Sequence, residues 1–81
     1  ISMWDVSNVT SMAGMFREMS FNGDISGWDV SQVKETGCMF YENKTFMQNL
    51  SKWQLPSDCI SDNMFGRIKG FPKRFKPKGV Q

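Results

Sequence analysis

The chain contains no histidine, and this absence removes several classes of enzyme from consideration. Imidazole is the usual general base for serine and cysteine nucleophiles and a common zinc ligand, so Ser-His-Asp, Cys-His and histidine-based zinc sites are excluded. The two cysteines, Cys38 and Cys59, form no Cys-x-x-Cys pair and match no metal-binding spacing. We therefore expect a protein that is not an enzyme and that binds neither a cofactor nor a metal.

Long apolar stretches are also missing, because Asp, Ser or Lys interrupts every apolar run well before the roughly 18 residues that a transmembrane helix needs. The 81 residues allow one small domain. A domain of this size buries only roughly 60% of its unfolded surface, so we expect a disulfide, a repeat array or a partner to support it. The sequence starts at Ile1 with no signal peptide, and we expect it to be a piece of a longer protein.

Charge is divided unevenly along the chain. Residues 1–65 contain four basic and eight acidic residues, whereas residues 66–81 contain six basic residues and no acidic one. Pro72 and Pro77 exclude a continuous helix in this tail, so we predict an extended basic arm that also carries Phe71 and Phe75. The arm is a candidate anion-binding element for nucleic acid, a heparin-like glycan or anionic lipid. The alternatives are a linker, a segment that folds back on the acidic body, or a cap over the last repeat. Its six cations are Arg67, Lys69, Lys73, Arg74, Lys76 and Lys78.

An internal repeat organises the remainder. Residues 1–9 align with residues 25–33 at an offset of 24, with seven of nine positions identical, and a third copy begins at Leu50, offset by 25. A fixed period of this length is typical of stacked-coil proteins. We predict a repeat domain over residues 1–65, with copies at about 1–24, 25–49 and 50–65, followed by a separate segment over 66–81. The residues expected to form core ladders are Trp4, Trp28, Trp53, Met15, Met39, Met64, Phe16, Phe40 and Phe65.

The pattern within each copy predicts a strand and a short helix. Ile25, Trp28 and Val30 are spaced as in a short extended segment. Val9, Met12, Ala13 and Phe16 are spaced i, i+3, i+4 and i+7, the pattern of one helix face. We therefore predict an α/β fold: a short leucine-rich-repeat-like solenoid of three coils, each with a parallel strand and a helix.

Two further features suggest cross-links or sites. Cys38 and Cys59 fall near one another on adjacent copies, where a disulfide would add about 3 kcal/mol; the alternative is two free thiols in small buried sites. Asp5 and Asp29 occupy equivalent positions and could form a row of carboxylates. Gln54 ends this row in the third copy, so we expect surface residues without a metal.

The repeat resembles a known family. Residues 4–16, Trp-Asp-Val-Ser-Asn-Val-Thr-Ser-Met-Ala-Gly-Met-Phe, and residues 20–31, Ser-Phe-Asn-Gly-Asp-Ile-Ser-Gly-Trp-Asp-Val-Ser, are similar to the BspA-like surface repeat. That repeat occurs in many tandem copies in bacterial surface proteins. It is also described as a mycoplasma-type lipoprotein domain of unknown function. The resemblance covers about residues 1–65. It implies a leucine-rich-repeat-like array on the cell surface or secreted, acting in adhesion or protein binding, with no catalytic residues to carry over.

Two functions follow from these observations. The first is a non-enzymatic surface module, part of a longer array, that binds another protein through positions that differ between copies. These positions are Ser2, Met3, Ser26, Gly27, Ser51 and Lys52. The alternative is anion binding through the basic arm.

Overall fold

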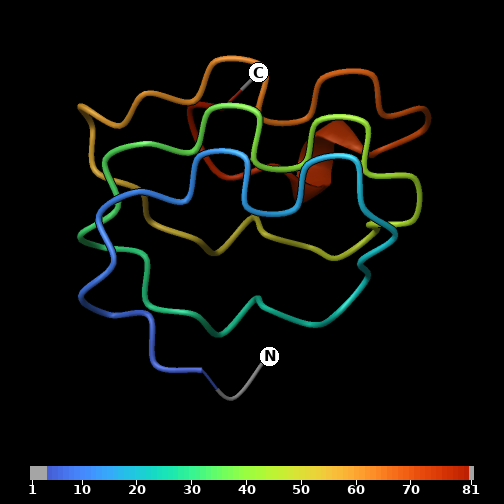
Figure 1. Cartoon of the computed structure of the whole chain (residues 1–81). Helices are drawn as coiled ribbons and strands as arrows, with labels where there is room; N and C mark the ends of the chain where they lie inside the picture. Colours follow the sequence, from blue (N-terminus) through green and yellow to red (C-terminus); the bar gives the residue numbers. More distant parts are fainter. Residues whose placement is uncertain (1–3, 81) are drawn as a thin grey trace.

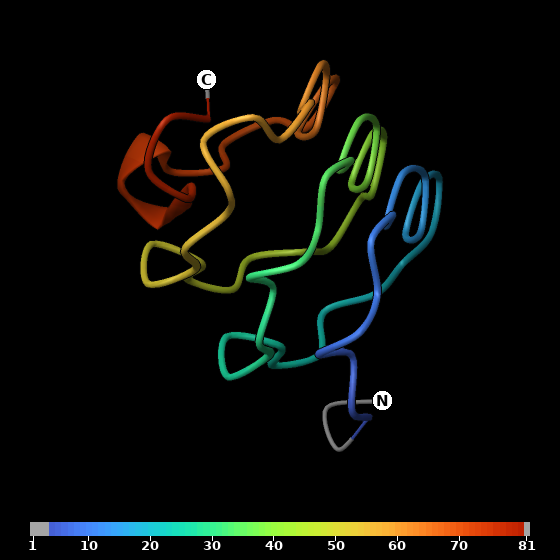
Figure 2. The ribbon, with the colours of Figure 1, turned by 90° about the vertical axis from the view of Figure 1, so that its left-hand side faces the viewer.

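The computed structural model describes residues 4–80, which wind into three coils stacked along one axis (Figure 1). Coil 1 comprises residues 4–24, coil 2 residues 25–49 and coil 3 residues 50–71. Residues 72–80, the cap segment, lie against coil 3 and include the 3-10 helix η1 (Lys73–Phe75), which is the only helix in the described part of the chain. Seen from the side, successive coils are displaced in one direction from the N-terminal to the C-terminal end (Figure 2).

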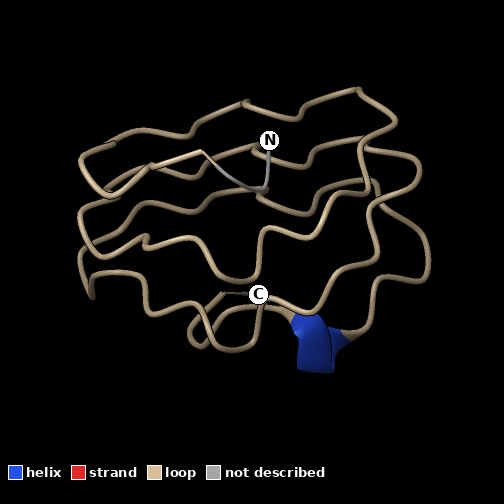
Figure 3. Cartoon of the chain, turned by 90° about the horizontal axis from the view of Figure 1, so that it is seen from below, coloured by secondary structure: helices blue, strands red, loops and turns tan. Residues whose placement is uncertain are grey.

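The predicted strand-and-helix solenoid is wrong. Within residues 4–80 no strand forms, and pairing between coils is limited to isolated parallel bridges that join Ser11 to Glu35 and Glu35 to Ile60. Figure 3 shows turns and irregular backbone everywhere except η1. The coils therefore stack without a sheet on one side or helices on the other.

The segment expected to be helical consists of consecutive turns. The Met15 N–H donates to the Met12 carbonyl at 3.1 Å and the Arg17 N–H donates to the Gly14 carbonyl at 3.1 Å. Gly14 has φ +68° at the third position of its turn, as a type II turn requires, and Cys38 has φ +56° at the equivalent place in coil 2. A left-handed residue cannot continue a right-handed helix. We call residues 11–18, 35–42 and 60–67 the return legs of the three coils.

On the opposite side of the stack, short Asp-apolar-Ser motifs make the corners, and Asn49-Leu50-Ser51 takes this place where coil 2 meets coil 3. A carboxylate oxygen of Asp5 accepts the Ser7 N–H at 3.0 Å, and Asp24 holds Ser26 in the same way at 3.1 Å. Such a turn, closed by an Asp or Asn side chain, replaces the strand expected at Ile25, because the backbone bends at each motif. The residue in the middle of each motif points into the core. These middle residues are Val6, Ile25, Val30 and Leu50, and all four are buried.

The return legs are joined by hydrogen bonds from alternate residues. The N–H groups of coil 1 donate toward coil 2, as in Met12 to Glu35 at 2.8 Å, and those of coil 2 donate toward coil 3, as in Thr36 to Ile60 at 2.8 Å. Each leg therefore has a donor side facing the next coil and an acceptor side facing the previous one. This series pairs 12, 14, 16 and 18 with 35, 37, 39 and 41, and 36, 38, 40 and 42 with 60, 62, 64 and 66. Where the legs begin, two bonds run the other way: the Lys34 N–H donates to the Thr10 carbonyl at 2.7 Å, and the Ile60 N–H donates to the Lys34 carbonyl at 2.8 Å.

Six phenylalanines form the centre of the core. Within each coil two rings stack, at centroid distances of 4.1, 4.1 and 4.5 Å in coils 1, 2 and 3. Between coils the rings lie 5.4–6.2 Å apart and nearly parallel. We call this set the phenylalanine ladder. Its members are Phe16, Phe21, Phe40, Phe46, Phe65 and Phe71.

The basic tail is not an extended arm. Phe71 completes the phenylalanine ladder, and the carbonyl of Phe75 accepts the Leu50 N–H at 2.8 Å, so the tail continues the coil pattern beyond coil 3. Pro77 is buried, and Val80 packs against the core. Apolar side chains interspersed among the cations therefore cover part of the end of the stack. This arrangement corresponds to the cap among the alternatives that the tail's sequence left open.

Candidate interaction surfaces

The three tryptophans have the same register but different environments. Trp28 and Trp53 are 6% and 3% exposed, whereas Trp4 is 55% exposed. The indole N–H of Trp53 donates to the Ile25 carbonyl of the preceding coil at 3.1 Å. The repeated methionines follow the same trend: Met39 and Met64 are buried, and Met15 is only partly covered. The least buried tryptophan and the least buried repeated methionine therefore both lie in coil 1, at the N-terminal end of the stack.

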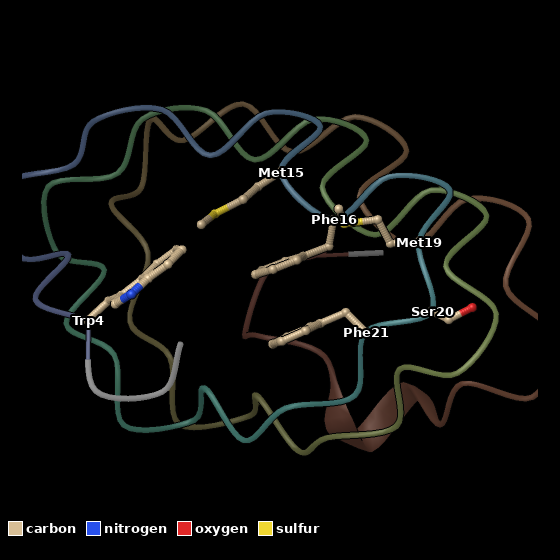
Figure 4. Close-up of a pocket in the computed structure, with 6 residues that line it drawn as sticks. All are labelled: Trp4, Met15, Phe16, Met19, Ser20 and Phe21. Carbon is tan, nitrogen blue, oxygen red and sulfur yellow. The ribbon is translucent and has the colours of Figure 1, made fainter.

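The N-terminal end of the stack carries an apolar hollow of about 580 Å³. Met15, Phe16 and Phe21 point into the interior of the coil toward Trp4 on the opposite side, while Ser20 points outward (Figure 4). The stacked pair Phe16 and Phe21 is covered on one side by coil 2. We call this surface the N-terminal end face. It is lined by Trp4, Met15, Phe16, Met19, Ser20 and Phe21.

A second candidate surface is a row of exposed turns. Ser26 and Gly27 form a turn closed by the Trp28 N–H on the Ile25 carbonyl at 3.1 Å; Ser51 and Lys52 form the equivalent turn in coil 3. All four are exposed, while the flanking residues are buried. A hollow of about 570 Å³ lies beside this row, lined by Ser51, Lys52, Trp53, Gln54, Leu55 and Lys78. Ser2 and Met3, the corresponding residues of the first copy, lie outside the described residues.

The candidate anion-binding residues lie in the cap segment and in the residues just before it. Arg67, Lys69, Lys73, Arg74 and Lys78 are exposed, and Lys76 is partly covered. The Lys76 ammonium lies 5.5 Å from the centroid of Phe65, and the Arg74 guanidinium lies 5.1 Å from that of Phe75. Two of the six cations therefore interact with rings of this chain.

Cys38 and Cys59 are free thiols in the structure. The thiol of Cys59 lies 3.9 Å from the hydroxyl of buried Thr36, and burial raises the pKa of this thiol above its usual range. A raised pKa leaves the thiol largely protonated at neutral pH, which lowers its reactivity.

Each of the corner aspartates accepts a hydrogen bond from the serine two residues further along the chain. Hydrogen bonds from Ser7 and Ser31 lower the pKa of Asp5 and Asp29 respectively, and Ser26 does the same for Asp24. Each carboxylate is thus used by its own turn. In the described part of the chain, no group of three or more Cys, Asp or Glu side chains is placed to hold a metal ion. The spacing Asp-x-Ser was the sequence signal for these turns.

Asn43 is a structural residue that sequence reasoning missed. Its side chain is buried and donates to the Phe16 carbonyl of coil 1 at 3.2 Å, while its oxygen accepts the N–H groups of Thr45 and Phe46 at 3.1 and 3.0 Å. It therefore fixes the loop between Phe40 and Phe46, which is one residue longer than the loop between Phe16 and Phe21. An Asn in the loop between two repeated phenylalanines was the available signal.

Among known proteins, one family model matches the sequence. It is described as a Mycoplasma protein of unknown function, DUF285, and it covers residues 1–77. Comparison with curated proteins and with solved structures gave no match. No helix in residues 4–80 is long and apolar enough to cross a membrane.

Proposed function

The chain belongs to the DUF285 family, whose function is unknown, and we propose that it is a non-enzymatic module that binds another protein. In this proposal it acts as part of a longer repeat array, exposed at the cell surface or secreted, in adhesion or a related interaction. The family match extends over nearly the whole chain, and it agrees with the resemblance to BspA-like surface repeats.

One observation supports the proposal most directly: in coils 2 and 3 the repeated Trp and Ile or Leu positions are buried, while Gly27 and Lys52, which differ between the copies, lie in exposed turns. Trp28 and Trp53 are buried, as are Ile25 and its equivalent Leu50. The intervening pair is Ser-Gly in coil 2 and Ser-Lys in coil 3, and both pairs are exposed. A constant frame that presents varied side chains in a row is suited to recognition by shape and hydrogen bonding rather than to catalysis.

Binding to an array of purified extracellular proteins tests this function. We expect at least one protein to bind, and the double variant Gly27→Glu, Lys52→Glu to weaken that binding by tenfold or more. A Cβ at Gly27 meets no atom within 4 Å, so the fold tolerates the change. The control is Lys44→Glu, which repeats the Lys52→Glu charge reversal at an exposed residue outside the turn row. Equal binding by the double variant and the control would show that the turns are not the contact surface.

The alternative of anion binding through the cationic tail gains no support from a specific observation. The phenylalanines that were candidates for stacking on bases or entering lipid are used within the protein, Phe71 in the phenylalanine ladder and Phe75 in an edge contact with it. We therefore retain protein binding as the single proposed function.

A further inference from the structure

One asparagine in the chain is followed by glycine. Asn22 precedes Gly23, whereas the other asparagines precede Val, Lys, Leu or Met; they are Asn8, Asn43, Asn49 and Asn63. The backbone nitrogen of the next residue can attack an asparagine side chain, and a side chain on that next residue hinders the attack. Glycine offers no such hindrance, because it has no Cβ and leaves the backbone its full conformational freedom. The sequence therefore contains one favourable position for this reaction.

Packing explains why asparagine and glycine are adjacent here. A Cβ on Gly23 would lie 2.6 Å from Cζ of Phe21, so a larger residue would displace this ring of the phenylalanine ladder. Asn22 links coils 1 and 2, because its side-chain oxygen accepts the Met47 N–H at 2.8 Å and the side-chain amide of Gln48 at 3.0 Å. Each residue thus has its own structural reason, and their adjacency creates the reactive pair.

The nitrogen atoms of this pair are free, whereas the oxygen atoms of Asn22 are held. Asn22 is exposed, and neither its side-chain nitrogen nor the N–H of Gly23 donates a hydrogen bond to any residue among 4–80. The backbone carbonyl of Asn22 also accepts the side-chain amide of Gln48, at 3.1 Å. Gln48 therefore binds Asn22 at both of its oxygens and fastens its side chain to coil 2.

We propose that Asn22 is a site of spontaneous deamidation, which Gln48 delays while coils 1 and 2 stay joined. The Gly23 nitrogen gives its proton to solvent and bonds to the side-chain carbonyl carbon of Asn22. The bond from that carbon to the side-chain nitrogen breaks, and the nitrogen takes up a proton and leaves as ammonia. Water then opens the resulting succinimide ring at either carbonyl, which gives aspartate or isoaspartate. Ring closure turns the side chain toward its own backbone, so the bonds to coil 2 open first.

The two products act differently on the junction between coils 1 and 2. Aspartate keeps the length of the side chain, and its carboxylate accepts the Met47 N–H and the Gln48 amide in charge-assisted hydrogen bonds. Isoaspartate routes the backbone through the former side chain, which adds one methylene group before Gly23. That addition shifts Gly23 relative to the ring of Phe21, so isoaspartate loosens the junction whereas aspartate preserves it.

Incubation of the 1–81 chain at neutral pH, followed by peptide mapping with mass spectrometry, measures the rate at each asparagine. We expect Asn22 to be modified first. Its rate should be about tenfold or more below that in an acetylated and amidated peptide of residues 19–26, because three hydrogen bonds restrain it only in the folded chain. Earlier modification of another asparagine, or equal rates in chain and peptide, would overturn the proposal.

The variant Gln48→Ala tests the protecting residue. It removes two of the three restraining bonds, so deamidation at Asn22 should accelerate by about threefold or more. Asn49→Ala is the matched control, since the bond it removes is to Ser51, and its rate at Asn22 should change by less than about twofold. Equal acceleration in both variants would show that general loosening, and not Gln48, sets the rate. The comparison of the unaltered chain with the peptide does not depend on how either variant folds.

Urea unfolding of the separated products tests the effect on the junction. Asn22→Asp reproduces the aspartate product and should unfold at a urea concentration no lower than that of the unaltered chain near neutral pH. The isoaspartate form, purified by chromatography from the incubated chain, should unfold at a lower concentration. Equal midpoints for the two forms would contradict the role of Asn22 in joining the coils. The reaction lies away from the exposed turns, so its outcome is independent of the turn-row test.

Discussion

The rings of Phe40 and Phe46 lie 4.1 Å apart and nearly parallel at the centre of the phenylalanine ladder. Phe46 is buried, while its equivalent in coil 1, Phe21, is covered on one side only. We expect Phe46→Ala to cost about 3–5 kcal/mol, because it leaves a cavity between two coils, and Phe21→Ala to cost clearly less. Urea unfolding followed by tryptophan fluorescence measures both. Equal losses would mean that the ladder is not the main stabilising core.

The corner aspartates predict a specific acid lability. Hydrogen bonds hold the pKa of Asp5, Asp24 and Asp29 in the folded chain below the ordinary value of 3.8, so protonation favours the unfolded state. Their stabilising effect is present above that value and is lost as the pH falls through the lower folded-state pKa values. We expect the triple Asp→Asn variant to show a flatter dependence of Tm on pH between about pH 2 and 4.

The chain supplies its own precedent for this variant. Asn49, the last residue of coil 2, occupies the corner position that leads into coil 3, and its side-chain oxygen accepts the Ser51 N–H at 2.9 Å. An amide therefore maintains the turn without titrating, and the triple variant should fold normally at pH 7. If its acid unfolding profile matches that of the unaltered chain, the corner carboxylates do not determine acid stability.

The sequence predicted the register of the coils better than their conformation. The spacing from Trp to Met-Phe placed Phe16, Phe40 and Phe65 in equivalent positions, and their rings stack. The second column lies outside the predicted core ladders, although Phe21, Phe46 and Phe71 are also spaced by 25 residues. For Phe71, the flanking Pro72 and Pro77 and the surrounding cations favour an extended arm, with a cap over the last repeat as one of the alternatives.

The helix prediction failed for a physical reason visible in Met12 and Phe16. Both side chains are buried, and they are four residues apart, close to the spacing of one helical turn. Two successive turns, which contain the left-handed residues Gly14 and Glu18, repeat the side-chain direction much as one helical turn does. Gly14 signals such a turn, but Glu18, Cys38 and Asn63 also have positive φ, which those residue types adopt less readily. The coil-to-coil hydrogen bonds hold these conformations, and a single copy of the sequence does not reveal them.

Asn43 should contribute more to stability than its polarity suggests. Asn43→Ala removes three hydrogen bonds and leaves the Phe16 carbonyl and the N–H groups of Thr45 and Phe46 without their partner. Unsatisfied buried groups are costly, so we expect a loss of about 2–3 kcal/mol by urea unfolding. Asn49→Ala, which removes one exposed turn bond, is the control and should lose less than about 1 kcal/mol. A similar loss in both variants would argue against the role of Asn43 as the link between coils 1 and 2.

Removal of residues 72–81 should both destabilise the chain and make its two ends complementary. The truncated chain loses the packing of Phe75, Pro77 and Val80 and the Phe75 carbonyl that accepts the Leu50 N–H, at a cost of about 2–4 kcal/mol. It also uncovers coil 3, whose N–H groups of Ser61, Asn63, Phe65 and Arg67 donate to no described residue. In another molecule these groups can meet carbonyls of coil 1 that accept from no described residue, those of Ser11, Ala13, Met15 and Arg17. Because that contact is head-to-tail, it need not close into a ring, and sedimentation velocity should show association that increases with concentration.

The full-length control Lys73→Gln, Lys78→Gln removes two exposed charges and should remain as stable and as monomeric as the unaltered chain, since the cap acts through its apolar residues. A truncated chain that stays monomeric and equally stable would show that the cap segment does not close the stack.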